Sequence, residues 1–409
     1  MENKRIKPYY NSEIPSDWQI KKLGNLGKIV SGLTYSPEDI CEETGVLVLR
    51  SSNVQGGQIS FDDNVFVKVN DGDFNPVKNG DILICVRNGS KTLIGKCALI
   101  NENAEGMALG AFMAVFRGDY NNYLIHVFNT DIYNREIYRN LGATINSING
   151  SDLKEFKIPF PPLPEQRAIA SLLSTWDEAI SKTHALIAQK EFRKKWLMQN
   201  LLTGKKRLKG FNEEWKNNTL KNILKVAGKP FIPVKNELYQ QIGIRSHAKG
   251  IFYKDKVTGE SLGNKRVFGI EPHCFVVNIV FAWEHAVAKT TENEIGMIAS
   301  HRFPMYKPKK EILDLDYLLY YFKSSRGKYL LMLASPGGAG RNKTLGKSEF
   351  MNLQIPVPSI EEQTAIATIF QTADKEIQLL KAKLDKLKEQ KKGLMQVLLT
   401  GKKRLKIDK

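Results

Sequence analysis

The chain of 409 residues is 42% hydrophobic and 25% charged, a globular composition whose length allows two or three domains. It has no apolar run of the ~18 residues that a membrane helix requires, no signal-peptide core at its N-terminus and no CxxC pair among its four cysteines, so we expect a cytoplasmic protein without a disulfide scaffold. The formal net charge of +18 favours a polyanionic partner such as nucleic acid.

Residues 1–157 are predicted to form a mixed α/β module. The runs 45–49 and 81–86 have the composition of short strands, turn residues such as Asn79-Gly80 punctuate the segment, and residues 121–140 are typical of a helix. The segment carries 17 basic and 19 acidic residues. Any surface that binds nucleic acid in this module must therefore be a local patch.

Residues 158–210 are predicted to form one long helix. Pro164 and Glu165 are typical of a helix N-terminus, and Gly204 is typical of a helix end. Between them, residues recur at alternating spacings of four and three in the pattern of a coiled-coil seam, which also passes through Thr183, Lys190 and Lys194. The apolar seam positions are Ile169, Leu173, Trp176, Ile180, Ile187, Leu197 and Leu201.

Residues 211–354 are predicted to form a second mixed α/β module. A strand-like run covers 275–280, and residues 314–333 are typical of a helix. The segment carries 22 basic and 13 acidic residues, and it shares little identity with the first module outside a few anchors such as Trp18 and Trp215.

Residues 355–409 repeat the first long-helix segment. Residues 158–209 align with 355–406 at a constant offset of 197, with 26 identities in 52 positions, and both copies end in LLTGKKRLK. Ala373 and Lys391 also lie on the second seam, and its other positions are Ile366, Phe370, Ile377, Leu380, Leu384, Leu387, Leu394 and Leu398. Because the offset also matches Trp18 with Trp215, the protein is a tandem duplication.

The fold class that follows is α+β (mixed α/β), with two globular domains, residues 1–157 and 211–354, joined by two long helices, residues 158–210 and 355–409. Two seams in one chain most simply pair with each other, in either a parallel or an antiparallel arrangement. The alternative is that each helix packs on its own domain. We favour an intramolecular antiparallel coiled coil with pseudo-twofold symmetry.

No motif in the sequence indicates an active site. A P-loop beginning at Gly337 would need glycine where Asn342 stands, and it would have to follow a strand and open a helix. The six histidines show no paired metal-ligand spacing. These observations favour a binding protein.

Candidate DNA contacts are polar residues on loops next to strand-like runs. Arginine can bind guanine through two hydrogen bonds, asparagine can pair with adenine, and lysine can reach a phosphate, although a structural role in the loop is the alternative for each residue. In the first domain the candidates are Arg50, Ser51, Asn53, Arg87, Asn88 and Lys91. In the second domain they are Arg245, Ser246, His247, Lys249, Trp283, His285, Arg341 and Lys343. The Gly-Lys-Lys-Arg clusters at 204–207 and 401–404 suit either phosphates or the negative end of a helix.

With the duplication and the paired helices established, the chain resembles the DNA specificity subunit of type I restriction–modification systems. The resemblance covers essentially the full length. It rests on the helix entries IPFPPLPEQ and IPVPSIEEQ, the exits LLTGKK, and the segments Asn79–Leu83 and Ala108–Phe112.

The resemblance implies two target-recognition domains, each reading half of a bipartite DNA site, and helices that fix the gap between the half-sites. It also implies two methyltransferase (modification) subunits docked on the helices, with restriction (translocase) subunits joining them. The chain itself would be non-catalytic. S-adenosylmethionine, ATP and magnesium would belong to the partners.

Two other classes of function stay open on the sequence. One is a coiled-coil scaffold that organises proteins without reading DNA. The other is an NTP-dependent enzyme that uses the loop at 337–344.

Overall fold

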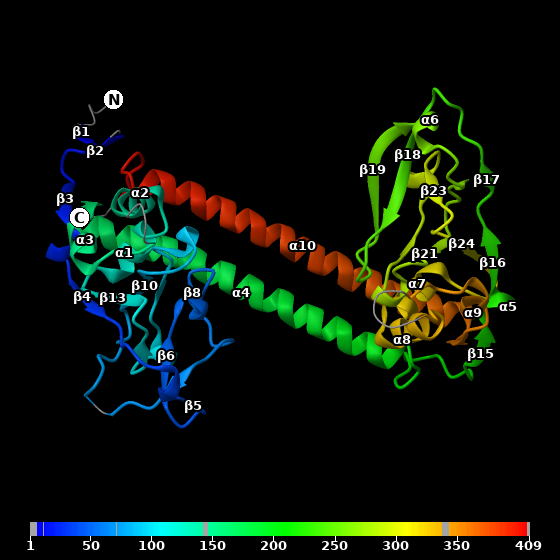
Figure 1. Ribbon diagram of the computed structural model, residues 1–409, viewed down its shortest axis with the longest axis horizontal. Coiled ribbons are helices and arrows are strands. Elements are labelled where there is room, and N and C mark those ends of the chain that lie inside the picture. Colours follow the sequence, from blue (N-terminus) through cyan, green and yellow to red (C-terminus); the bar gives the residue numbers. More distant parts are fainter. Residues whose placement is uncertain (1–5, 11, 71, 142–145, 338–342, 407–409) are drawn as a thin grey trace. The chain divides into compact units, whose positions relative to one another are not determined.

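A computed structural model of the chain describes residues 6–10, 12–70, 72–141, 146–337 and 343–406. Its contacts divide the chain into unit 1, residues 1–183 with 383–409, and unit 2, residues 184–382. Each unit has a globular domain and one portion of each long helix (Figure 1). None of the helices in the described ranges has the length and hydrophobicity of a membrane span.

The globular domain of unit 1 contains two main sheets. In the first, the strand order is β11-β10-β13-β4, with every neighbour antiparallel. Its strands are β4 (Lys28–Ser31), β10 (Ile82–Cys85), β11 (Cys97–Leu99) and β13 (Met113–Arg117). The second sheet has the order β12-β6-β9-β5, and β12 is parallel to β6. Its strands are β5 (Ile40–Cys41), β6 (Val46–Leu49), β9 (Phe66–Val67) and β12 (Ala108–Leu109).

The globular domain of unit 2 repeats the topology of the first sheet and the parallel strand pair of the second. Its first sheet has the order β22-β21-β24-β16, again antiparallel throughout. The strands are β16 (Leu224–Ala227), β21 (Phe275–Val277), β22 (Val287–Lys289) and β24 (Met305–Pro308). The second sheet has the order β17-β20-β23-β18-β19, and its β18–β23 pair is parallel, like β6–β12. Its strands are β17 (Pro230–Phe231), β18 (Leu238–Ile244), β19 (Ile251–Thr258), β20 (Val267–Gly269) and β23 (Ile298–Ser300).

The domains also differ in the strand that follows β6 and its counterpart β18. In unit 1, β6 is followed by the short hairpin β7–β8 (Val54–Gln55 and Gln58–Ile59). In unit 2, β18 continues directly into the eight-residue β19. Smaller elements complete the units: β1 (Ile6–Tyr9), β2 (Ser12–Pro15), β3 (Gln19–Lys22), β15 (Lys216–Thr219), α3 (Gly150–Glu155), α5 (Leu220–Ile223), α6 (Gly259–Leu262) and α9 (Lys347–Met351).

Each of the two helices predicted inside the domains is divided in two. Residues 121–140 form α1 (Asn121–Val127) and α2 (Asp131–Asn140), and residues 314–333 form α7 (Leu315–Lys323) and α8 (Ser325–Leu333). Ser324 has an extended backbone, and its Oγ accepts a hydrogen bond of 3.1 Å from the Gly327 amide. It therefore acts as an N-cap that starts a new helix. Thr130, also extended, separates α1 from α2.

The long helices α4 (Leu163–Leu201) and α10 (Ile360–Leu398) lie side by side in each unit (Figure 1). In unit 2, Lys190 pairs with Glu376 and Lys194 with Asp374, each at 2.5 Å, so the residue numbers rise along one helix as they fall along the other. In unit 1, Asp177 pairs with Lys391 at 2.5 Å. These pairs confirm the intramolecular antiparallel coiled coil. Every seam position predicted from the sequence is buried or half-buried.

The start of one long helix is fastened to the exit of the other inside each unit. In unit 2, Glu362 is 1% exposed and accepts hydrogen bonds of 2.7 and 2.6 Å from Arg207 and of 3.0 Å from Trp215 Nε1. Gly204, just before Arg207, has the left-handed φ of 69° that glycine at a helix end adopts. We call this group the glutamate clasp.

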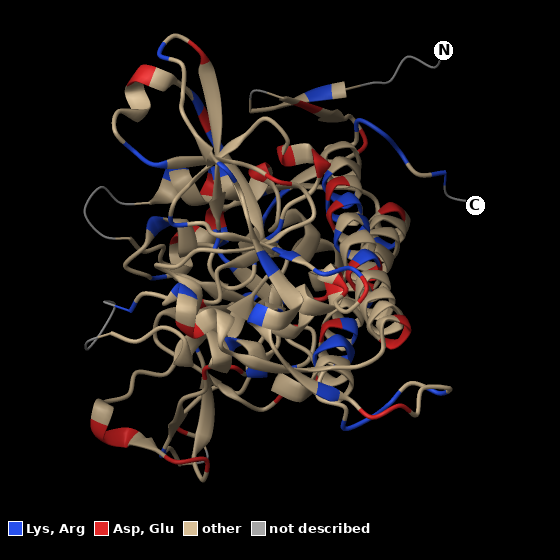
Figure 2. Ribbon diagram, turned by 90° about the vertical axis from the view of Figure 1, so that its right-hand side faces the viewer, with Lys and Arg blue, Asp and Glu red and all other residues tan. Residues whose placement is uncertain are grey.

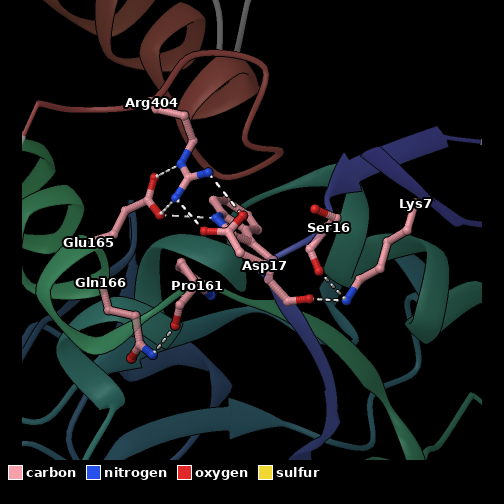
Figure 3. A network of polar contacts seen from close by, with 8 residues as sticks. Lys7, Ser16, Asp17, Pro161, Glu165, Gln166 and Arg404 are labelled. Carbon is pink, nitrogen blue, oxygen red and sulfur yellow. Dashed lines mark hydrogen bonds and ion pairs between the residues drawn. The ribbon is translucent and has the colours of Figure 1, made fainter. Parts of the chain in front are cut away.

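Unit 1 repeats the glutamate clasp at an offset of 197 residues. Glu165 accepts hydrogen bonds of 2.5 and 2.6 Å from Arg404 and of 3.0 Å from Trp18 Nε1. Arg404 also donates to both oxygens of Asp17, at 3.0 and 2.9 Å, and Figure 3 shows it between the two carboxylates. The last basic residue of each Gly-Lys-Lys-Arg cluster thus binds a carboxylate of its own chain.

The strand ahead of each long helix is held against a short helix of the domain. Strand β14 (Lys157–Phe160) precedes α4, and β25 (Gln354–Val357) precedes α10. Tyr123 of α1 donates to the Pro159 carbonyl at 3.2 Å, and Tyr317 of α7 donates to the Pro356 carbonyl at 3.0 Å. The helices α1 and α7 therefore correspond at an offset of 194.

We expect Arg207→Met to destabilise unit 2 by about 3 kcal/mol. The substitution leaves Glu362 buried without its guanidinium partner, and the partial exposure of Arg207 places the cost at the lower end of the range for a broken buried pair. Urea denaturation measures the change. Lys205→Met, which removes an exposed charge from the same loop, is the control and should cost under about 0.5 kcal/mol. Equal losses in the two variants would contradict the role of the clasp.

The stability of unit 1 should fall as the pH is lowered from about 6.5 to about 4. Burial, reinforced by Lys391, lowers the pKa of His126 to about 4, so between these values the unfolded chain takes up a proton that the folded chain excludes. Urea denaturation across this pH range checks the slope. His126→Gln should flatten it, whereas His184→Gln, a change at an exposed position, should leave it intact.

Candidate nucleic-acid interface

In unit 1, the loops that follow β6 and β10 meet at one end of the domain. Asn88 Nδ2 donates a hydrogen bond of 3.1 Å to Ser51 Oγ. The Arg87 amide donates to the Phe112 carbonyl at 3.1 Å, which adds the loop after β12. Because β6 and β12 are parallel, their carboxyl ends point the same way and their loops gather there. The structure therefore brings together residues that the sequence placed on separate loops.

Two of the predicted contacts in the first of these loops hold its shape. Asn53 is fully buried, and its Nδ2 donates to the carbonyls of Ser60 and Asp63 at 3.0 and 3.1 Å. Its Oδ1 accepts from the Arg50 amide at 2.9 Å. Arg50 is paired with Asp63 at 3.0 Å. In this conformation Asn53 has no surface for a base, and Arg50 would have to release Asp63 to reach one.

Arg87 and Lys91 are exposed at the tip of this loop cluster. The Arg87 guanidinium lies 5.7 Å from the centre of the Phe112 ring, which is itself 56% exposed. A cation beside an exposed ring suits both a phosphate and the face of a base. Phe112 was not among the residues singled out from the sequence, although it belongs to the segment Ala108–Phe112.

Unit 2 forms the corresponding loop pair through Glu284. Ser246 Oγ donates to Glu284 Oε2 at 2.9 Å, and the His247 amide donates to the Glu284 carbonyl at 2.8 Å. The Ala248 amide donates to the His285 carbonyl at 2.7 Å. The loop after β18 is therefore tied to the loop after β21, as the loop after β6 is tied to the loop after β10.

The turn between β18 and β19 presents three of the predicted contacts to solvent. Arg245, His247 and Lys249 are exposed, and the Arg245 guanidinium lies 5.1 Å from the centre of the Phe252 ring. His247 and Ala248 have φ of 59° and 55°, a left-handed conformation that costs a residue with a side chain about 1–3 kcal/mol. Their hydrogen bonds to the neighbouring loop hold this conformation, which turns His247 outwards.

Trp283 and His285 support the loop from inside. Trp283 Nε1 donates to the Val280 carbonyl at 3.1 Å. The His285 ring bonds to the Phe322 carbonyl, and burial lowers the pKa of its imidazole. Lys343 is half-buried, and its backbone forms an isolated antiparallel β-bridge with Gly337. Arg341 lies outside the described residues.

Basic and acidic residues are interspersed along the described parts of the long helices. In Figure 2, bands of Lys and Arg alternate with bands of Asp and Glu along the long helices. Outside the predicted contacts, the exposed strand β19 adds Lys254 and Lys256 beside Tyr253. Across the described ranges, no group of three His, Cys, Asp or Glu side chains is arranged to hold a metal ion.

Comparison with known proteins identifies the family of the chain. The model of a family described as type I restriction modification DNA specificity domain matches residues 15–189 and again residues 212–389. A putative type I restriction enzyme MjaX specificity subunit of Methanocaldococcus jannaschii is 26% identical, over 96% of this chain and 95% of its own length. The type I restriction enzyme EcoKI specificity subunit of Escherichia coli is 29% identical over 50% of this chain and 46% of its own length.

A similar fold is found in a solved structure. The S subunit of a type I restriction-modification system from M. genitalium superposes with a TM-score of 0.57 at 17% identity, covering 96% of this chain and 98% of that one. Because the family model matches most of the residues in two consecutive copies, the chain belongs to the family of type I restriction modification DNA specificity domains.

Proposed function

We propose that this chain is the DNA specificity subunit of a type I restriction–modification complex, in which each globular domain reads one half of a bipartite target. The observation that carries the proposal is the loop pair built in the same way in both units but with unlike exposed side chains. Unit 1 presents Arg87, Lys91 and Phe112, whereas unit 2 presents Arg245, His247 and Lys249.

The two loop clusters present unlike side chains, in unit 1 after β10 and β12 and in unit 2 after β18, and such a difference fits two unlike half-sites. Base edges in the major groove offer different donor and acceptor patterns, so a change of side chain changes the base that is preferred. The charge of the domains differs too, since residues 1–157 sum to −2 and residues 211–354 sum to +9. The second domain should therefore supply more of the non-specific attraction to phosphates.

The long helices act in this proposal as the spacer and as the docking surface for methyltransferase subunits. Each has 39 residues and is about 58 Å long at 1.5 Å per residue. Their seams are occupied by each other, while charged residues of both signs line their outer faces (Figure 2). Restriction subunits would join the methyltransferases. S-adenosylmethionine, ATP and Mg²⁺ act on those partners, and this chain, itself non-catalytic, supplies the choice of target.

Exchange of residues 211–354 for the equivalent domain of another such protein tests the proposal. We expect one half-site to change while the other half-site and the spacer persist. A map of methylated bases in cells that carry each version, with the methyltransferase subunits, reads both half-sites directly. Cells without the gene are the control and should lack the motif.

An unchanged motif after the exchange would overturn the assignment of one half-site to each domain. If deletion of the gene removes no methylated motif, the result would favour a scaffold that does not read DNA. Arg207 and Glu362 lie outside the exchanged residues, so the helix frame is preserved if the donor domain supplies a tryptophan in the place of Trp215.

Arg245→Ala should weaken binding of the preferred sequence by about 1–3 kcal/mol if Arg245 binds a guanine through two hydrogen bonds, and it should relax the preference at one base pair only. Competition binding with single-substituted duplexes measures the preference. Lys249→Ala in the same turn is the matched variant. If Lys249 binds phosphate, its loss lowers affinity for all sequences alike and reduces the salt slope by about one. A uniform loss in Arg245→Ala would instead identify Arg245 as a phosphate contact.

A further inference from the structure

Both units contain a three-part junction at which a short helix of the globular domain contacts an ion pair of the coiled coil. In unit 1 the ion pair is Asp177–Lys391, and in unit 2 it is Asp374–Lys194, each at 2.5 Å. The two pairs correspond at the offset of 197, which relates Asp177 to Asp374 and Lys194 to Lys391. The lysines lie at corresponding seam positions and are only 15% and 19% exposed.

The domain reaches each pair through one buried side chain. In unit 1, His126 of α1 is 4% exposed, with its Nδ1 3.7 Å from Asp177 Oδ2 and its Nε2 3.3 Å from Ser174 Oγ. In unit 2, Tyr320 of α7 is 5% exposed and donates a hydrogen bond of 2.8 Å to Asp374 Oδ2. The lysine that pairs with Asp374 also lies over the Tyr320 ring, 5.5 Å from its centre.

His126 and Tyr320 are counterparts. They differ by the offset of 194 that also relates Tyr123 to Tyr317, the residues that bind the strands ahead of the long helices. The two domains thus use the corresponding turns of α1 and α7 to contact corresponding aspartates of the long helices. They do so with different side chains, a histidine in unit 1 and a tyrosine in unit 2.

A half-buried lysine in an apolar seam specifies register, because any slip of one helix along the other would leave its charge without a partner. The third contact extends this restriction to the domain. Rotation of α1 about α4 would separate His126 from both Asp177 and Ser174, and rotation of α7 about α10 would separate Tyr320 from Asp374.

We infer that His126 and Tyr320 are positioning residues that set the spacer length the protein accepts between its half-sites, by fixing the orientation of each recognition domain on the coiled coil. The inference rests on the proposed function. One added base pair moves a half-site by about 3.4 Å and turns it by about 35°. A domain that is free to rotate on the helices would tolerate that change, and a domain locked at the junction would not.

The test uses the full chain in complex with its methyltransferase subunits and the double variant His126→Phe with Tyr320→Phe. Both substitutions keep a ring in the buried site and leave the Lys–Asp pairs intact, but remove the link to the aspartate. Binding is measured to duplexes that carry both half-sites with the optimal spacer and with one base pair more or fewer. We expect the preference for the optimal spacer to fall about tenfold, with the base preferences inside each half-site retained.

Two further variants separate positioning from simple loss of stability. Lys190→Met breaks the Lys190–Glu376 pair, which joins α4 directly to α10, and should leave the spacer preference intact. His126→Tyr introduces in unit 1 the residue type that unit 2 uses. With Tyr320 unchanged, this variant should keep most of the preference for the optimal spacer.

An unchanged spacer preference in the double variant, or an equal loss of affinity for every spacer, would overturn the inference. Failure of the proposed function is distinguishable from this result. In that case the unmodified complex would itself show no preference for two half-sites at a fixed separation.

Discussion

The glutamate clasp is the contact on which the rest of each unit depends. A carboxylate that is 1% or 2% exposed is costly to bury unless every oxygen has a partner, and here an arginine and a tryptophan supply them. The glutamate belongs to the start of one long helix, the tryptophan to the start of a globular domain, and the arginine to the exit of the other helix. Antiparallel pairing is what brings a start and an exit together, so the clasp forms only when the helices pair in that direction.

The architecture could be predicted from the sequence because it depends on periodic and repeated patterns. The offset of 197 established the duplication, and the spacing of Ile169, Leu173 and Trp176 predicted the seam. The sheets could not be derived in the same way. Strands such as β9 and β12 have only two residues, too few to show an alternation, and their partners lie far away in the chain. The division of residues 314–333 depended on Ser324, a single capping residue within an apolar run.

The sequence placed the candidate contacts on loops next to strands but gave no direction for their side chains. The structure brings these loops together, yet sequence alone could not tell which of their side chains turn inwards. Asn53 and Arg87 are both polar residues next to a strand, but one is enclosed by three backbone groups and the other is exposed beside Phe112. That difference arises from contacts with segments distant in sequence, such as Ser60 and the loop after β12. The lysines at seam positions also had no explanation until their aspartate partners were placed.

Buried contact positions and exposed loop positions together explain how two unlike globular domains can share one pair of helices. Each clasp joins the start of one long helix, the exit of the other and the start of a globular domain, so a change there alters the geometry of a whole unit. Arg87, Lys91, Arg245 and Lys249 are exposed, so their side chains can change without disturbing the core beneath. The contact between domain and coiled coil lies between these extremes, since His126 and Tyr320 occupy one site with different chemistry. The geometry of each unit is therefore maintained by buried charged contacts, whereas in the proposed function the sequence preference depends on the exposed loop residues.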